Sequence, residues 1–301
     1  MQPATDRALR LGVRVLAGTF TFLLVLAAGA AGVAALLRQL EDVAGEPVRC
    51  AAVDGETSWF LETDQAETAA LIAARARQLD LPARAVTIGL ATGLQESKLR
   101  NIDYGDRDSV GIFQQRPSQG WGTVEQIMDP VYSTDAFYEG LSRVDGYIEM
   151  DVTVAAQAVQ RSGFPDAYAK HEARSRAWAS GLTGYSAASI TCTLDDPGAG
   201  SVDAYVARVH RDYAPAGEQV PGVSAAGDAA VVLDAPAVLG EDEEPLRAGW
   251  SLAQWSVAVA DALEVVEVRH ADQVWTRDEG AWAPAEEPTD DGQVTVLVST
   301  G

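Results

Sequence analysis

Apolar residues recur at helical spacing early in the chain. Between residues 64 and 79 the apolar positions are Ala69, Ile72, Ala73, Ala76 and Leu79. This period predicts an amphipathic helix, and Asp64 followed three residues later by Glu67 predicts its N-terminal cap. Pro82 ends that helix and can begin the next one, which we expect to end near residues 96–98.

The same reasoning extends the helical region to about residue 181. Apolar spacing predicts further helices over residues 123–128, 133–149, 151–161 and 165–181. Residues 100–122 show no period and are rich in Gly, Asp, Pro and Ser, which is typical of a long functional loop. No segment between residues 48 and 194 alternates like a strand. The pattern therefore predicts a helical domain with one elaborate loop.

The composition changes near residue 195. Residues 195–301 hold 21 acidic and 5 basic side chains, so this region carries −16 of the net charge of −22. Residues 201–213 are predicted to be a helix, and residues 214–246, rich in Ala, Gly, Pro and acid, have the composition of a linker. A helix over 250–263 and alternating strands at 265–268, 274–277 and 294–298 predict a small α/β unit over 247–301.

An uncharged apolar run extends from Val15 to Leu37. At about 1.5 Å per helical residue, a run of this length spans a hydrocarbon core of roughly 30 Å. Arginines precede it and acidic residues follow it, which predicts a single-pass cell-membrane protein with a cytoplasmic N-terminus and residues 38–301 outside. The alternative is a cleaved signal peptide with a cleavage site at Ala28-Gly29-Ala30.

Both alternatives place the remainder of the chain outside the cytoplasm, where cysteines are commonly oxidised. In an oxidising compartment Cys50 and Cys192 are expected to form a disulfide that joins the two ends of the helical block. The expected organisation is a cytoplasmic tail (1–14), a transmembrane helix (15–37), a stalk (38–62), a helical domain (63–194), a helix with an acidic linker (195–246) and an α/β unit (247–301).

Composition and motifs exclude several classes of function. The net charge of −22 argues against nucleic-acid binding, which needs cationic groups to displace counterions from phosphate. The three histidines and two cysteines lack metal-ligand spacing, so we expect no metal site. The chain contains no G-x-S-x-G, P-loop or G-x-G-x-x-G motif, and no cofactor is expected.

Glu96 is the strongest candidate for chemistry. It is predicted to end an apolar helix, where the negative end of the macrodipole disfavours an anion. Partial burial would also raise its pKa. A carboxyl group with a raised pKa is what a general acid needs near neutral pH.

Two short motifs give this carboxyl a context. Glu96-Ser97 is followed on the predicted loop by Gly111-Ile112-Phe113-Gln114. A Glu-Ser pair at a helix end and a G-[LIV]-x-Q motif on the next loop resemble the lysozyme-like superfamily, specifically soluble-type lytic transglycosylases and their actinobacterial relatives. The resemblance covers residues 64–182. It implies a mainly α lysozyme-like domain, here behind the transmembrane helix and followed by the small C-terminal α/β unit.

The resemblance also implies a function. Glu96 would protonate the glycosidic oxygen between N-acetylmuramic acid and N-acetylglucosamine, so the partner would be a peptidoglycan glycan strand. The residues expected to contact sugar are Ser97, Ser109, Gly111, Phe113, Gln114, Gln115, Trp121 and Gln160.

One departure from the family leaves the partner of Glu96 open. The family usually carries an A-Y-N-x-G segment whose Tyr orients the catalytic Glu. The nearest match in this chain is the run Ala158-Val159-Gln160-Arg161-Ser162, which has neither the Tyr nor the Asn. The candidate replacements are Tyr104, Gln157, Tyr168 and His171.

The number of carboxylates separates the possible mechanisms. A hydrolase needs a second carboxylate, about 5 to 9.5 Å from the first, and Asp103, Asp106 and Asp108 on the loop are available. A lytic transglycosylase needs only one, because the 6-hydroxyl of the substrate attacks. We expect a lytic transglycosylase, with a muramidase also open. The alternative is a catalytically inactive glycan-binding or scaffold protein. The sequence gives no oligomeric state.

Overall fold

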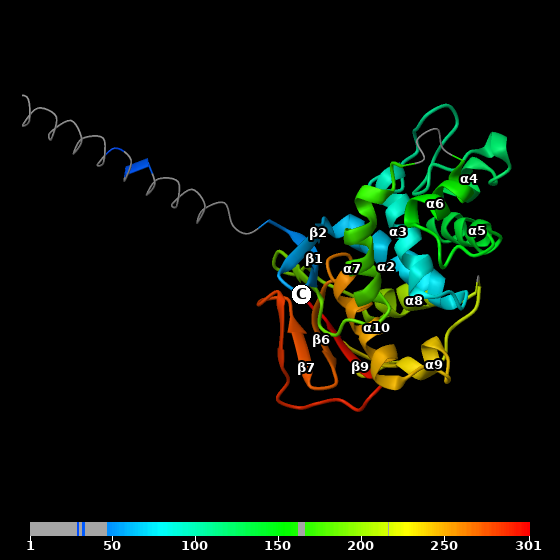
Figure 1. Cartoon of the computed structure of the whole chain (residues 1–301). Helices are drawn as coiled ribbons and strands as arrows, with labels where there is room; N and C mark the ends of the chain where they lie inside the picture. The colour runs from blue at the N-terminus through cyan, green and yellow to red at the C-terminus, as the bar shows by residue number, and fades with distance from the viewer. Residues whose placement is uncertain (1–28, 30–31, 34–46, 162–165, 216) are drawn as a thin grey trace, which may run out of the picture. The chain divides into compact units, whose positions relative to one another are not determined.

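Helices and antiparallel strands are combined in one unit over residues 48–301 of the computed structural model (Figure 1). The structure describes residues 29, 32–33, 47–161, 166–215 and 217–301. Its first part is a hairpin of β1 (Arg49–Asp54) and β2 (Thr57–Leu61). The helical elements that follow are α2 (Thr63–Gln78), α3 (Ala83–Glu96), η1 (Pro117–Gln119), α4 (Val124–Met128), α5 (Pro130–Ser142), α6 (Val152–Gln160), η2 (Ala169–His171) and α7 (Glu172–Leu182).

The helical region agrees in broad outline with the sequence pattern. Helix α3 ends at Glu96, as predicted, and its central residues are buried. The cap of α2 differs from the prediction. Glu62 is the N-cap, and its backbone N–H donates to the side-chain oxygen of Gln65 at N3, at 2.9 Å. The capping box therefore begins two residues earlier than Asp64.

A small antiparallel sheet of order β2-β1-β3 contains β3 (Ile190–Thr193). The prediction of no strand between residues 48 and 194 was wrong, because Cys50, Ala51 and Ala52 are buried in succession and so leave no alternating pattern. Cys50 lies directly opposite Cys192 in the register of β1 and β3. The two cysteines form the predicted disulfide.

The second antiparallel sheet has the order β4-β5-β9-β6-β7-β8. Its strands are β4 (Val223–Ala225), β5 (Ala230–Asp234), β6 (Val265–His270), β7 (Gln273–Thr276), β8 (Ala281–Pro284) and β9 (Gln293–Val298), accompanied by α8 (Val202–Tyr213), α9 (Ala235–Leu239) and α10 (Pro245–Ala258). Residues 214–246, predicted to be a linker, contain β4, β5 and α9. The prediction failed because β5 offers only two inward side chains, Val231 and Leu233, as a signal.

Helix α10 joins the two parts of the unit. It packs on α2, α7 and β3, and also on β6, β9 and α9 (Figure 1). Most of its residues are buried, including Trp255. The Gln254 side-chain oxygen accepts hydrogen bonds from the backbone N–H groups of Ser189 and Ile190, at 2.7 and 2.8 Å. The C-terminal strands are therefore part of the same core as the helices.

The predicted fold class was consequently wrong. A mainly α domain with a small separate α/β unit does not describe residues 48–301, since they contain antiparallel sheets of three and six strands bound to the helices through α10. The predicted transmembrane segment, residues 15–37, lies outside the described residues except for residues 29, 32 and 33. None of the helices in the described part of the chain is long and apolar enough to span a bilayer.

A buried arginine connects α2 with α5 and with the residues that follow α8. Arg75 is 2% exposed and contacts the Asp135 carboxylate through two nitrogens, each at 2.8 Å. Another of its nitrogens donates to the Ala214 carbonyl at 2.7 Å. A buried guanidinium with several acceptors fixes the relative positions of these elements, because losing any acceptor leaves part of its charge unpaired.

The disulfide gives a first testable prediction. Replacing both Cys50 and Cys192 with alanine should lower the free energy of unfolding by about 4–5 kcal/mol, because the unfolded chain regains the entropy of a long closed loop. Urea denaturation of the oxidised wild type and of the double variant measures the difference. A midpoint that does not move, with an unchanged m-value, would show that the cross-link contributes nothing to stability.

Candidate functional site

Glu96 occupies the last turn of α3, where it is half-buried. Its carboxylate oxygen Oε1 accepts a hydrogen bond of 2.6 Å from the hydroxyl of Tyr168. Burial raises the pKa of Glu96 above its ordinary value of 4.5, and hydrogen bonds from Tyr168 and Gln160 oppose part of that rise. The local structure therefore favours the protonated form more than an exposed site would, and the Tyr168 hydroxyl holds the carboxyl in a fixed orientation.

Tyr168 is the residue that contacts Glu96 among the four candidates. Its side chain is fully buried, immediately before η2. Tyr104 is 70% exposed on the loop, where its carbonyl accepts a hydrogen bond from Gln114. His171 points to the side-chain oxygen of Gln95 at 3.2 Å, and burial lowers the pKa of this imidazole to about 4.

Gln160 is the second group that holds Glu96. It ends α6, and its Nε2 atom donates a 2.8 Å hydrogen bond to the Phe113 carbonyl. Its side chain also opposes the rise in the Glu96 pKa that burial causes. Gln160 thus joins the catalytic candidate to the Gly111–Gln114 loop.

Ser97 connects the same helix end to the same loop. It is buried, and its hydroxyl donates to the Ile112 carbonyl at 2.7 Å and accepts from the Arg100 backbone N–H at 3.1 Å. Both partners of the Ser97 hydroxyl are therefore backbone groups of the protein itself. The Glu-Ser pair therefore supplies a side chain for chemistry and another that positions the loop.

The loop itself is tightly folded. Gly111 has a φ of +80°, and a Cβ atom there would lie 2.9 Å from the Ile127 carbonyl oxygen, so only glycine fits without displacement. The Gln114 amide donates to the carbonyls of Tyr104 and Gly111, both at 3.3 Å. These contacts close the loop on itself and leave Gln114 half-buried.

Three of the predicted sugar contacts are inside the protein. The Phe113 ring has no exposed surface and stacks on Phe137 with 4.4 Å between centroids. Gln115 is buried and donates to the Ser133 carbonyl at 3.0 Å, and Ser109 is also buried. In this structure these side chains support the loop from within.

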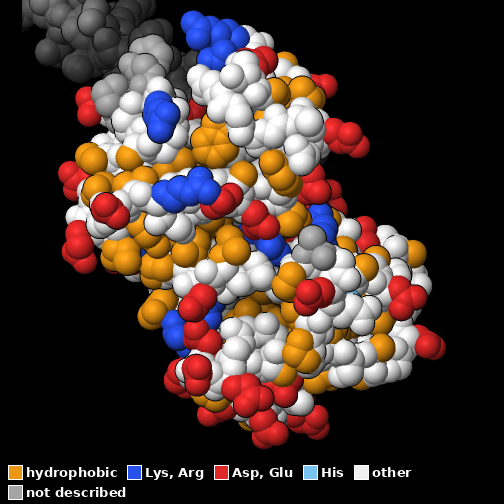
Figure 2. All heavy atoms as spheres, turned by 90° about the vertical axis from the view of Figure 1, so that its right-hand side faces the viewer, with side chains coloured by type: hydrophobic (Ala, Val, Ile, Leu, Met, Phe, Trp, Pro, Cys, Tyr) orange, Lys and Arg blue, Asp and Glu red, His pale blue; other side chains and the backbone are white. Residues whose placement is uncertain are grey.

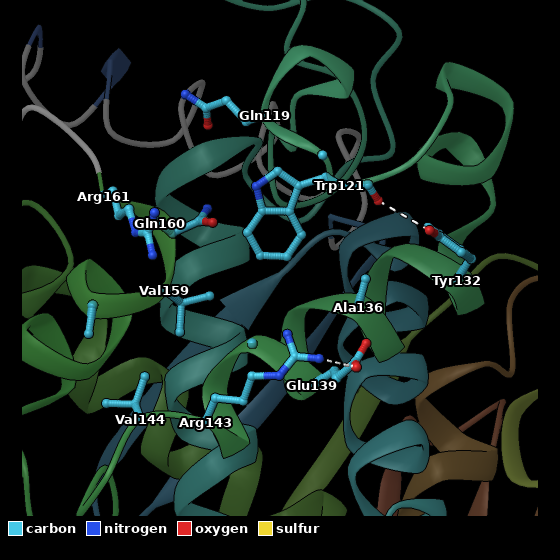
Figure 3. A pocket seen from close by; sticks show the side chains of 13 residues that line it. Gln119, Trp121, Tyr132, Ala136, Glu139, Arg143, Val144, Val159, Gln160 and Arg161 are labelled. Carbon is cyan, nitrogen blue, oxygen red and sulfur yellow. Dashed lines mark hydrogen bonds and ion pairs between the residues drawn. The ribbon is translucent and has the colours of Figure 1, made fainter.

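A cavity of about 730 Å³ adjoins this region between α5 and α6 (Figure 3). Of the predicted residues, Trp121 and Gln160 line it. Glu96 is not among the lining residues, whereas Gln160, which opposes the rise in the Glu96 pKa, lines the cavity. The indole of Trp121 lies within the cavity, and the hydroxyl of Tyr132 donates to the Trp121 carbonyl at 3.2 Å (Figure 3).

Sequence reasoning missed the other side of the cavity. Tyr132, Ala136, Glu139, Gly140 and Arg143 on α5 all line it. They recur three or four residues apart and so occupy one helix face, with small residues in the middle. The sequence signal for this side of the cavity was a helix face on which small, charged and aromatic side chains alternate. It is weak because exposed helix faces often have such a mixture.

The loop aspartates have other roles. Asp108 accepts from Arg116 Nε and from the Ser118 backbone N–H, each at 2.8 Å, and these donors hold the pKa of its carboxyl well below the usual range. Asp106 is 92% exposed beside Arg107. Burial raises the Glu96 pKa without any contribution from an acidic neighbour. Among the described residues, no other carboxyl contributes to the shift of the Glu96 pKa.

No group of three or more His, Cys, Asp or Glu side chains within the described residues could hold a metal ion. Compared with models of known protein families and with curated proteins, the chain matches none of them.

The Tyr168 hydroxyl gives a second testable prediction. Tyr168→Phe removes a hydrogen bond to the charged form of Glu96, so the pKa of Glu96 should rise above that of the wild type. Titration of the glutamate side-chain carbons by NMR, with Glu96→Gln to identify the resonance, measures the change. Tyr205→Phe removes a buried hydroxyl bonded to Ser256 and serves as the control. A Glu96 pKa that stays constant in Tyr168→Phe would contradict this role.

The raised pKa gives a third prediction, on stability. Because the folded state binds the Glu96 proton more tightly, the resulting stabilisation is complete below pH 4.5 and is lost as the pH rises through the raised folded pKa. Glu96→Gln cannot lose a proton. The free energy of unfolding of Glu96→Gln minus that of the wild type should therefore be larger at pH 8 than at pH 4, because only the wild type loses stability as the pH rises. Urea denaturation at both pH values tests this, and a difference independent of pH would count against burial of the charge.

Proposed function

We propose that the protein cleaves the bond between N-acetylmuramic acid and N-acetylglucosamine in peptidoglycan, as a lytic transglycosylase with Glu96 as its only acid and base. The observation that carries this proposal is the half-buried Glu96 carboxyl at a helix end, with the Tyr168 hydroxyl 2.6 Å from its oxygen. The likeness of Glu96-Ser97 and Gly111–Gln114 to soluble-type lytic transglycosylases supports the same assignment.

The proposed reaction uses two proton transfers at the Glu96 carboxyl. Protonated Glu96 donates its proton to the glycosidic oxygen as the bond from that oxygen to C1 of N-acetylmuramic acid breaks. The carboxylate then accepts the proton of the 6-hydroxyl of the same sugar, whose oxygen forms the new bond to C1. The product is a 1,6-anhydro end, and Glu96 is protonated again. Tyr168 and Gln160 stabilise the carboxylate between the two transfers.

The absence of a carboxylate partner favours this route over hydrolysis. Hydrolysis with two carboxylates needs the second one to bind the sugar directly or to activate a water. In the described residues the Glu96 pKa shift has no acidic contributor, and Asp108 is occupied by Arg116 and Ser118. An attack by the substrate's own hydroxyl needs no second carboxylate, either as a nucleophile or as a base that activates water.

The disulfide supports an extracytoplasmic place of action. Cys50–Cys192 is buried between β1 and β3, and such bonds persist in oxidising compartments. A glycan strand outside the cytoplasm is the proposed partner. The expected single membrane pass with a cytoplasmic N-terminus depends on residues 15–37 and stays a prediction.

A second candidate is a glycan-binding or scaffold protein without turnover. Two observations favour it. The family's orienting Tyr is replaced by Val159, and the lining of the cavity includes Gln160 but not Glu96. This candidate shares the cavity and differs only in whether bonds are broken.

Product analysis gives a fourth prediction and separates the two candidates. The purified protein should release 1,6-anhydro-muropeptides from sacculi, and Glu96→Gln should lower the rate by about 10²- to 10⁴-fold, the range expected for loss of a general acid. Glu149→Gln, an exposed residue outside the cavity, is the matched control and should retain the full rate. Mass spectrometry identifies the ends formed.

Other products would change the assignment in defined ways. Reducing ends would indicate a hydrolase. Glycan binding without released fragments would support the scaffold function, and undiminished release by Glu96→Gln would show that another residue is the acid.

A further inference from the structure

The lining of the cavity between α5 and α6 contains more positive than negative charge. Arg143 and Arg161 line it, together with Glu139 (Figure 3). The whole chain has 22 basic and 44 acidic side chains and a net charge of −22. Figure 2 shows the basic side chains of one face as isolated spots among acidic ones. A cavity with two cations and one anion is therefore unusual for this surface.

The two arginines differ in their partners. Arg143 forms an ion pair with Glu139 across one turn of α5. Arg161 is exposed after α6 and forms no ion pair with any residue that the structure describes. Its backbone is fixed, because its N–H donates to the Gln157 carbonyl at 2.8 Å. Arg161 at the edge of the cavity is consequently available for a ligand, and Arg143 is partly neutralised by Glu139.

The aromatic floor between these groups is also fixed. A Cβ atom on Gly140 would lie 3.4 Å from the Trp121 ring and 3.1 Å from Val159, so the glycine lets the indole pack closely on α5. Trp121 thus presents a half-buried apolar surface between Glu139 on α5 and Gln160 on α6 (Figure 3). Sugars stack on such surfaces, and a nearby guanidinium can bind a carboxylate on the same molecule.

We propose that Arg161, assisted by Arg143, binds a carboxylate of the glycan strand, so that a charge contact in this cavity contributes to substrate affinity. This inference rests on the proposed function. The carboxylate has two possible sources. One is the peptide attached to N-acetylmuramic acid, and the other is the lactyl group of that sugar when the peptide has been removed.

Soluble strands of four kinds test the proposal. They are native peptide-bearing strands, the same strands with peptide carboxylates converted to amides, strands stripped of peptide so that the lactyl carboxylate is free, and neutral chito-oligosaccharides. Arg161→Gln should raise KM about 3- to 10-fold, with little change in kcat, for the strands that carry the carboxylate it binds, either the native or the stripped ones; this is the effect of losing one exposed charge-assisted contact. It should leave KM for amidated strands unchanged, and also the dissociation constant of chito-oligosaccharides, which lack the bond that is cleaved.

The stripped strands identify the source of the carboxylate. If Arg161→Gln raises KM for stripped strands and not for native ones, the lactyl group is the ligand. If it raises KM for native strands alone, the peptide is the ligand. Equal effects on all four kinds of strand would overturn the proposal.

A variant that should lower KM shows that the rise in KM expected for Arg161→Gln does not come from a general loss of structure. Glu139→Gln removes the anion and releases Arg143, so it should lower KM for native strands about twofold or more. Arg269→Gln, on β6, removes the same charge as Arg161→Gln outside the cavity and is the matched control. A Glu139→Gln protein that binds native strands less well would contradict the assignment.

Binding to inactive protein separates this inference from the proposed function. Titration calorimetry with Glu96→Gln and with Glu96→Gln/Arg161→Gln measures affinity for native and amidated strands without turnover. If the wild type shows no turnover but the affinity for native strands depends on Arg161, the proposed function fails and the carboxylate site stands. If turnover is present but both proteins bind native and amidated strands equally, the carboxylate site fails.

Discussion

The hydrogen bond from the Tyr168 hydroxyl to Glu96 is the contact on which the candidate site depends. It connects the end of α3 with the residue that precedes η2. Burial raises the pKa of the Glu96 carboxyl, and Tyr168 and Gln160 oppose part of that rise. The Tyr168 hydroxyl thus fixes the orientation of the carboxyl and lowers the cost of its charged form.

The antiparallel sheets support this arrangement at a distance. Helix α7 follows η2 and packs on α3, β1 and α10. The indole N–H of Trp178 on α7 donates to the Trp59 carbonyl on β2 at 2.9 Å, which ties the helix to the small sheet that the disulfide closes. Helix α10 then joins α7 to the six-stranded sheet. The C-terminal region thus stabilises the helix beside the site, although it contributes no side chain to it.

The sequence predicted the parts of the molecule that local signals determine. The end of α3 at Glu96 and the Cys50–Cys192 disulfide followed from periodicity and from the position of the cysteines. The strands were missed because β1 is covered on both faces and β5 is short, so neither alternates over enough residues. Tyr168 was only one of four candidates, since the contact with Glu96 joins residues 72 positions apart and no local pattern records it.

The most direct test of Glu96 as the acid is a crystal structure of the Glu96→Gln protein with a peptidoglycan oligomer bound. The account predicts that the side chain at position 96 lies about 2.6–3.2 Å from a glycosidic oxygen on the C1 side of an N-acetylmuramic acid residue. An oligomer that fills the cavity with every glycosidic oxygen beyond the reach of this side chain would contradict it.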